Sequence, residues 1–201
     1  MNFDYSILPN IALGIALSAC CGFRVFIPML AGALAAHFNF ITLAQNMQWL
    51  SEWPAIICFA TAAIAEVAAY YIPFIDNALD TIATPLSVAA GTILATSILP
   101  LPADQPLLQW GIGLLSGGAA AGTLQLGTGL LRLFSSKATI GTGNVLVSTS
   151  ENAAAVTGSV LSFFIPVIVA VVLLLLIVWV LSKLIKTGLR LSTNRHERKL
   201  Q

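Results

Sequence analysis

The sequence predicts an all-α protein: a polytopic transmembrane helical bundle of five to six membrane segments, with broken or re-entrant helices. Of the 201 residues, 58% are apolar and 8% are charged, whereas a soluble domain carries about 25% charged residues. The mean hydropathy is +0.92, and several long apolar runs follow one another along the chain. This composition excludes a disordered chain, a nucleic-acid-binding protein and an ordinary cytosolic enzyme as leading classes.

The first apolar stretch covers residues 6–38, which is longer than the roughly 20 residues that cross hydrocarbon. Gly22 and Pro28 are expected helix breaks within it, and Arg24 lies near its middle. One interpretation is two half-length helices that meet at residues 21–24, and the other is one tilted helix kinked at Pro28. No lysine or arginine precedes the stretch, so we expect it to stay as an anchor and not to be cleaved as a signal peptide.

Residues 39–50 mix polar and apolar positions. They suit a loop or a helix in the membrane interface, with Trp49 and Trp53 as anchors. A second membrane helix is expected over residues 54–71, and it carries Glu66.

Prolines divide the next part of the chain. Pro73 is expected to end the second helix, and Pro85 to end a short helical segment over residues 74–83. Residues 85–100 would then form a short membrane segment, and the prolines of residues 100–106 indicate a loop.

Seven glycines lie in the helix expected over residues 107–134. Small residues let membrane helices approach closely, so this helix is expected to be central and offers a surface for a homo-oligomer. Residues 135–152 are rich in Ser, Thr and Gly and are interpreted as a loop. The last apolar stretch, residues 153–181, is the clearest membrane span and is interrupted by Pro166.

The charges after the last span predict orientation. Under the positive-inside rule a basic tail lies in the cytoplasm, which predicts a multi-pass protein of the inner membrane, with a transmembrane domain at 1–184 and a cytoplasmic tail at 185–201. Arg132 and Lys137 carry the same sign, yet one crossing before the tail would place them on the opposite side. Either the two signals disagree, or residues 141–166 re-enter the membrane and return. The basic residues that carry this signal, at the end of the last span and in the tail, are Lys183, Lys186, Arg190, Arg195, Arg198 and Lys199.

Arg24 is the charge that most needs a partner. Its guanidinium stays ionised, and desolvation at mid-membrane costs on the order of 3 kcal/mol or more. Glu66 is the candidate partner, because a carboxylate accepts two parallel hydrogen bonds from guanidinium. The pair either gates a polar pathway or binds a solute anion, or it only fastens two helices together.

Further polar residues group by helical spacing. Asp76, Asp80 and Thr84 are four residues apart and share one helix face. That face suits a hard cation or a proton, or its carboxylates are simply solvated at the bilayer surface. Glu151 and Asn144 belong to a second polar cluster that could face the first.

Residues with cofactor or metal chemistry show no matching pattern. The cysteines at 20, 21 and 58 and the histidines at 37 and 196 lack metal-ligand spacing, and the sequence contains no nucleophile triad, zinc-protease motif or nucleotide-binding loop. We therefore expect no metal, no cofactor and no enzymatic activity. The expected partner is the lipid bilayer, and no nucleic acid is expected.

Several motifs in order are familiar: GFRVFIPML at 22–30, IPFIDNALD at 72–80, TPL at 84–86 and NVLVSTSE at 144–151, together with Glu66. From about residue 11 to residue 175 the chain resembles a bacterial integral membrane protein family of unknown function (domain of unknown function 4126). The resemblance implies a helical membrane protein with recurring Arg, Glu and paired Asp positions, and it implies no activity.

Tyr70 and Tyr71 stand where that resemblance suggests a charged pair before the Ile-Pro step. This departure puts in doubt a mechanism that needs charges there. We interpret the two tyrosines as interfacial anchors.

The placement of charge leads to a functional hypothesis. The protein is expected to be a transporter or channel for a small solute or ion, with Arg24 and Glu66 at a midplane site and Asp76, Asp80 and Glu151 along an access route. The alternatives are a non-transporting scaffold or assembly factor, in which the glycine-rich helix docks a partner, and a lipid-modifying enzyme that uses the two aspartates.

Overall fold

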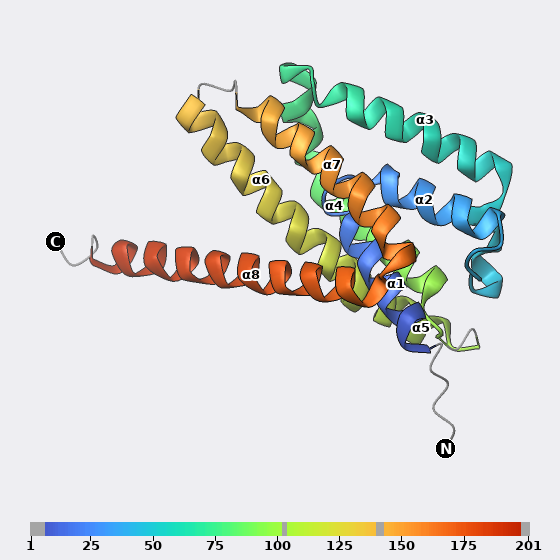
Figure 1. The fold of residues 1–201 in the computed structure, drawn as a ribbon. Helices are drawn as coiled ribbons and strands as arrows, with labels where there is room; N and C mark the ends of the chain where they lie inside the picture. The colour runs from blue at the N-terminus through green and yellow to red at the C-terminus, as the bar shows by residue number, and fades with distance from the viewer. Residues whose placement is uncertain (1–6, 102–103, 140–142, 198–201) are drawn as a thin grey trace.

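The computed structural model describes residues 7–101, 104–139 and 143–197, without the side chains of residues 73–78, 80, 136–139 and 187–197. This part of the chain contains eight α-helices, one 3-10 helix and one π-helical turn, and it has no strand (Figure 1). The prediction of an all-α fold is confirmed.

The first apolar stretch forms two helices, α1 (Ile7–Cys20) and α2 (Phe26–His37). Between them the chain packs against α6 so closely that a Cβ on Gly22 would lie 2.6 Å from Leu124 Cβ. The break therefore requires glycine at this point. Pro28 lies in the first turn of α2, where its missing N–H removes no helical hydrogen bond. The interpretation with two half-length helices is confirmed, and the kink predicted at Pro28 is wrong.

The 3-10 helix η1 (Gln45–Ser51) precedes α3 (Trp53–Ala69), at a bend of 59°. Trp49 and Trp53 are about half exposed, which fits the expected interfacial segment. Helix α3 lies beside α2 (Figure 1).

Helix α4 (Pro73–Ile98) begins at Pro73, as predicted, and continues through Pro85. The helix break predicted at Pro85 is therefore wrong. A proline is tolerated inside a packed membrane helix when neighbouring groups satisfy the backbone it frees.

The glycine-rich segment forms α5 (Pro106–Gly113), a π-helical turn η2 (Leu114–Gly118) and α6 (Ala119–Thr139) without interruption. Its inner glycines pack against α4, which also has a glycine at the contact: a Cβ on Gly91 of α4 would lie 2.6 Å from the carbonyl oxygen of Gly117. Gly111 and Gly129 instead face open space, with nothing within 4 Å of a Cβ. The inner glycines of this helix are therefore used for close contacts with α4 of the same chain, as expected of a central helix.

The segment that was predicted to be a loop, residues 135–152, is mostly helical, because α6 continues to Thr139 and helix α7 (Asn144–Phe164) covers its second half, so that prediction is wrong. Its hydroxyl side chains do not compete with the helix, because they donate to carbonyls of the preceding turn: Thr149 to Val145 and Ser150 to Val147, both at 2.7 Å. Helix α8 (Pro166–Glu197) follows a break at Ile165, as predicted for Pro166.

Helix α7 runs back along α6, and α8 reverses direction again, so α6 and α8 both end on the left of Figure 1. Residues 144–164 run in one direction as the single helix α7, so the return that was expected within residues 141–166 is made by α8 instead. Helix α8 continues to Glu197, so the predicted boundary between residues 184 and 185 falls inside a helix.

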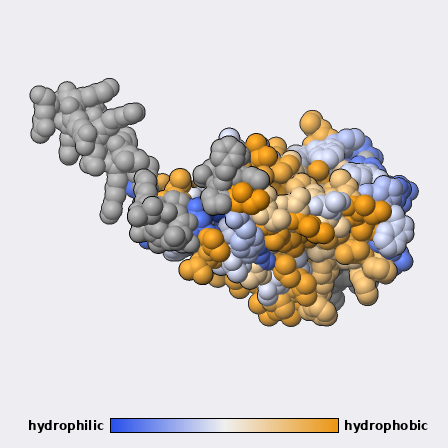
Figure 2. Space-filling model, turned by 90° about the horizontal axis from the view of Figure 1, so that it is seen from above, coloured by the Kyte–Doolittle hydropathy of each residue, from blue (hydrophilic) through white to orange (hydrophobic). Residues whose placement is uncertain are grey.

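Two described helical segments are long and apolar enough to cross a membrane, Thr81–Ile98 and Pro166–Lys186, or three if the bent pair η1 and α3 is one span. Helices α1 and α2 are apolar but shorter. The surface is consistent with lipid contact, because apolar residues cover much of the face in Figure 2. These findings fit a membrane protein, and the prediction of five to six segments is not confirmed.

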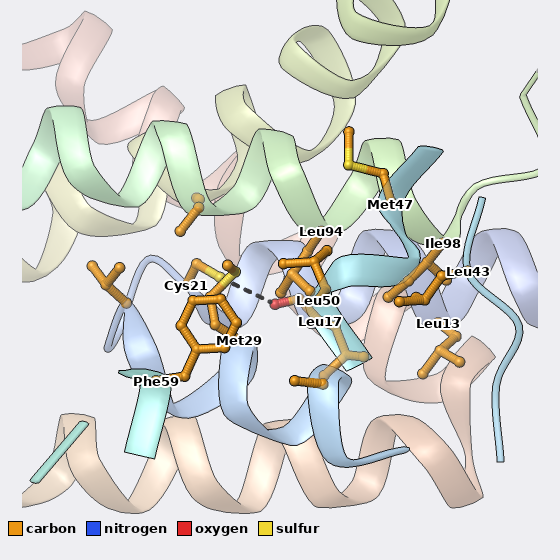
Figure 3. Close-up of a cluster of buried hydrophobic side chains, with 14 of the residues drawn as sticks. Leu13, Leu17, Cys21, Met29, Leu43, Met47, Leu50, Phe59, Leu94 and Ile98 are labelled. Carbon is orange, nitrogen blue, oxygen red and sulfur yellow. Dashed lines mark hydrogen bonds between the residues drawn. The ribbon is translucent and has the colours of Figure 1, made fainter. Parts of the chain in front are cut away.

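The main core lies where α1 crosses α4 and is covered by α2, η1 and α3. Cys20 and Cys21 are buried as expected, and the thiol of Cys21 donates to the carbonyl of Leu17 at 3.7 Å. Cys58 is exposed. Figure 3 shows the side chains of this core, among them Leu13, Leu17, Met29, Met47, Leu50, Phe59, Leu94 and Ile98.

Candidate functional site

Arg24 lies in the break between α1 and α2 and is 1% exposed. Its Nη1 is 3.0 Å from Glu151 Oε2, its Nη2 donates to the carbonyl of Ser148 at 3.2 Å, and its Nε donates to Asn152 Oδ1. All three partners are on α7. The broken helix therefore places a buried cation against α7, and its charge is balanced there.

Arg132 of α6 is the second buried cation, with 2% exposure. Its Nε donates to Glu151 Oε1 at 3.1 Å, and its Nη2 contacts Glu151 Oε2. Glu151 thus bridges two guanidiniums. The three side chains, called here the Arg–Glu–Arg cluster, carry a formal charge of +1 when ionised.

The sequence interpretation used Arg132 only as a topology signal and missed this role. Leu130, Leu131, Leu133 and Phe134 flank it, and a single cation inside an apolar run is the signal that would have found it. Because its charge is paired with Glu151, Arg132 is not a free determinant of orientation.

Tyr70 lies between the two guanidiniums. Its ring centroid is 3.8 Å from the Arg24 Cζ and 4.1 Å from the Arg132 Cζ, and the side chain is 5% exposed. A ring face attracts cations, and more strongly where water is excluded. The prediction that Tyr70 is an interfacial anchor is wrong, whereas Tyr71 is 44% exposed, as an anchor would be.

Glu66 of α3 accepts the backbone N–H groups of Val25 at 2.9 Å and Phe26 at 3.0 Å, one with each carboxylate oxygen. It therefore caps the N-terminus of α2, where free N–H groups and the helix dipole favour an anion. The predicted ion pair between Arg24 and Glu66 is wrong, because Arg24 pairs with Glu151. Glu66 instead fixes the backbone next to Arg24.

A hydrogen-bonded chain connects Arg24 to the surface. The amide of Asn152 accepts from Arg24 and donates to the Tyr71 hydroxyl at 3.3 Å, and that hydroxyl lies 3.2 Å from Thr149 Oγ1. Tyr71 and Thr149 are exposed, and Asn152 is half-buried. These three residues therefore link the buried cluster to exposed side chains.

A cavity of about 290 Å³ lies beside Glu66 and Tyr70, between α3, α4 and the start of α2. Glu66 and Tyr70 are its polar lining residues, and the rest of the lining is aliphatic or aromatic. The cavity gives a solute room next to two members of the site.

The other predicted site residues are placed as follows. Asp76 and Asp80 are on α4, but their side chains lie outside the described residues. Thr84 is half-buried on the same helix, and Asn144 begins α7, seven residues before Glu151. The structure thus brings together Arg24, Glu66 and Glu151 and adds Arg132 and Tyr70.

Metal ligands do not gather in the described part of the chain, where no group of three or more His, Cys, Asp and Glu residues could hold a metal ion. The donors gathered at the site are two guanidiniums, which hold the carboxylate of Glu151, and two backbone N–H groups, which hold that of Glu66.

The fold and the site define an all-helical protein of membrane type, with an Arg–Glu–Arg cluster held at a broken helix. Residues 11–186 match a family described as Domain of unknown function (DUF4126). The match covers most of the chain, so the chain belongs to this family, and the resemblance inferred from the motifs is confirmed. No curated protein and no solved structure matches the chain.

Proposed function

We propose that this protein carries a small solute or ion across the inner membrane and that the Arg–Glu–Arg cluster is its binding site. The observation that supports this function is that two buried guanidiniums share a single carboxylate. Charges buried in a membrane protein are costly and are commonly retained for function. The excess positive charge favours an anion as the transported species.

The geometry favours an oxyanion, either a carboxylate or a phosphate. Glu151 already presents a carboxylate to both guanidiniums, and guanidinium binds carboxylate and phosphate through the same paired hydrogen bonds. A substrate oxyanion competes with Glu151 for these donors. When the substrate leaves, Glu151 binds the two guanidiniums again and restores the resting site.

The N-terminus of α2 is a second position suited to an anion, since helix N-termini bind anions through free N–H groups. Glu66 occupies it. Displacement of Glu66 would expose the two N–H groups beside Arg24, and the adjacent cavity provides the space into which the carboxylate can move. The proposed site therefore has two anion positions, each filled by a side chain at rest.

Tyr71, Thr149 and Asn152 form the proposed gate. Opening requires the loss of two weak hydrogen bonds around the Tyr71 hydroxyl, at 3.2 and 3.3 Å. Asp76 and Asp80 follow Tyr71 in the chain and are the proposed lining of the outer access route, with Thr84 and Asn144 as further polar positions.

The proposed topology is a multi-pass protein of five to six segments with a cytoplasmic C-terminus. It is supported by the path of α7 and α8, which brings the ends of α6 and α8 to one side, and by the basic residues of the tail. A homo-oligomer through the glycine-rich helix would use the open positions Gly111 and Gly129, because the inner glycines contact α4.

Flux into proteoliposomes tests the proposal. Purified protein is reconstituted, and uptake of labelled phosphate, acetate and chloride is compared with protein-free vesicles. Wild type is expected to transport at least one of these anions, and Arg24→Ala to lose that flux. Lys186→Ala is the matched control, because it removes one exposed positive charge outside the site. Absence of wild-type flux for all three anions would overturn the proposal.

A scaffold without transport activity is the second candidate, and one observation favours it. Arg24, Arg132, Glu66 and Glu151 all have partners within the chain, as expected of a cluster that only fastens helices. Replacing the cluster by Met or Leu at its three positions separates the two functions. A structural cluster tolerates an apolar substitute well, so the cellular phenotype would persist, whereas a transport site would be lost.

A further inference from the structure

A groove of about 400 Å³ lies between α6 and α8, and no member of the Arg–Glu–Arg cluster lines it. The two helices touch where Gly127 meets Val180, since a Cβ on this glycine would lie 3.0 Å from the valine side chain. The helices then diverge toward their C-terminal ends (Figure 1). We propose that this groove binds one acyl chain of an anionic phospholipid and that Lys183 holds the lipid phosphate.

The residues that line the groove are the reason for proposing an acyl chain as its occupant. Leu124, Leu131 and Phe134 of α6 face Leu176 and Leu184 of α8. The volume is within the range of about 300–1,000 Å³ for small-molecule sites. Only 28% of the span Pro166–Lys186 is buried inside the protein, so in a bilayer this surface meets lipid. An acyl chain is the occupant with matching chemistry.

The position of Lys183 is the reason for proposing a lipid with an anionic headgroup. It is the charged residue of the groove lining, and it lies three residues before the end of the span Pro166–Lys186. At a rise of about 1.5 Å per residue, this position is close to the headgroups, which a lysine reaches with its flexible stem. Its ammonium lies 5.7 Å from the centroid of the Trp179 ring, another lining residue. The cation thus lies beside an aromatic side chain of the groove wall.

The headgroup class follows from charge. Phosphatidylglycerol carries a net negative charge, whereas phosphatidylcholine offers the same phosphate with a compensating cation. One lysine near an anionic surface contributes enough free energy for about a fivefold preference. The inference does not depend on the proposed transport function.

Fluorescence quenching of Trp179 tests the proposal. Trp49, Trp53 and Trp110 are replaced by Phe, and the full chain is reconstituted in vesicles that mix brominated phosphatidylglycerol or brominated phosphatidylcholine with unlabelled phosphatidylcholine. Quenching is expected to show about a fivefold preference for phosphatidylglycerol. Lys183→Gln should remove the preference, and Lys183→Arg should retain it.

Lys186→Gln is the matched control, because it removes the same charge one turn further along α8, outside the groove lining. Its preference should match that of the parent. Equal quenching by both lipids in the parent, or an equal loss in Lys186→Gln and Lys183→Gln, would overturn the proposal. Native mass spectrometry of the unmodified chain with both lipids gives a second measurement: selective retention of phosphatidylglycerol supports the site, and equal retention contradicts it.

Discussion

Replacing Glu151 by Gln tests the energetics of the Arg–Glu–Arg cluster. The substitution keeps the size and one acceptor oxygen of the side chain, and it removes the negative charge that Arg24 and Arg132 share. It leaves two like charges buried, at 1% and 2% exposure. Glu151→Gln is therefore expected to destabilise the protein strongly.

The magnitude follows from the contacts that remain. Removing one partner of a buried ion pair costs about 3–5 kcal/mol. Arg24 keeps its hydrogen bonds to Asn152 and Ser148, and Tyr70 still covers both guanidiniums. We therefore expect the free energy of unfolding to fall by about 3–5 kcal/mol in total, the cost of breaking one buried pair, although two cations lose their partner. Native proteins have about 5–15 kcal/mol of stability, so the midpoint of unfolding should fall clearly.

A thiol-reactive dye measures this loss in detergent micelles, because Cys20 and Cys21 are buried and react on unfolding. Cys58→Ser removes the background of the exposed thiol. Adding Arg132→Met to Glu151→Gln should recover about 2 kcal/mol, since it removes one unpaired buried charge. A loss below about 1 kcal/mol in Glu151→Gln, or no recovery in the double variant, would refute the reasoning.

Three further predictions concern packing, the aromatic ring and accessibility. Gly91→Ala should lower stability by about 1–3 kcal/mol, because its Cβ would lie 2.6 Å from a backbone oxygen of the facing helix. Gly111→Ala has open space around the added Cβ and should be neutral or stabilising. Equal effects of the two substitutions in thermal unfolding would contradict the close helix contact. Tyr70→Leu should cost about 1–2 kcal/mol through loss of its cation–π contacts, and Tyr70→Phe should retain them; an equal loss in both variants would assign the effect to the hydroxyl. Cys58 should react with maleimide in the folded protein and the two buried cysteines only after denaturation, and early labelling of all three would be inconsistent with the core.

The fold class and the helix breaks at Gly22 and Pro166 could be predicted from the sequence, because hydrophobic length and breaker residues act locally. Pro85 could not be predicted to stay inside a helix. Its effect depends on whether packing and nearby hydroxyls satisfy the backbone that it frees. Residues 144–152 were predicted to be a loop for a similar reason. Their Ser and Thr hydroxyls donate to carbonyls of their own helix and so do not disrupt it.

The candidate site was predicted in part. Arg24 and Glu66 were identified because a charge in an apolar stretch is costly, and Glu151 because of its polar neighbours in the sequence. The structure brings these three residues together. Their pairing could not be derived, since it depends on which helix faces the break. Arg132 was missed because a cation before a predicted loop resembles a topology signal, and only the tertiary contact with Glu151 reveals its burial.

The central claim is that the Arg–Glu–Arg cluster is an anion-binding site, and anion flux through Arg132→Gln protein tests it most directly. Arg132 is buried and belongs to the proposed site through its contact with Glu151. In proteoliposomes, the wild-type chain is predicted to transport phosphate or acetate above the level of protein-free vesicles. Arg132→Gln should abolish this flux, while Lys186→Gln should leave it unchanged. Flux at the wild-type level in correctly folded Arg132→Gln protein would contradict the proposed site.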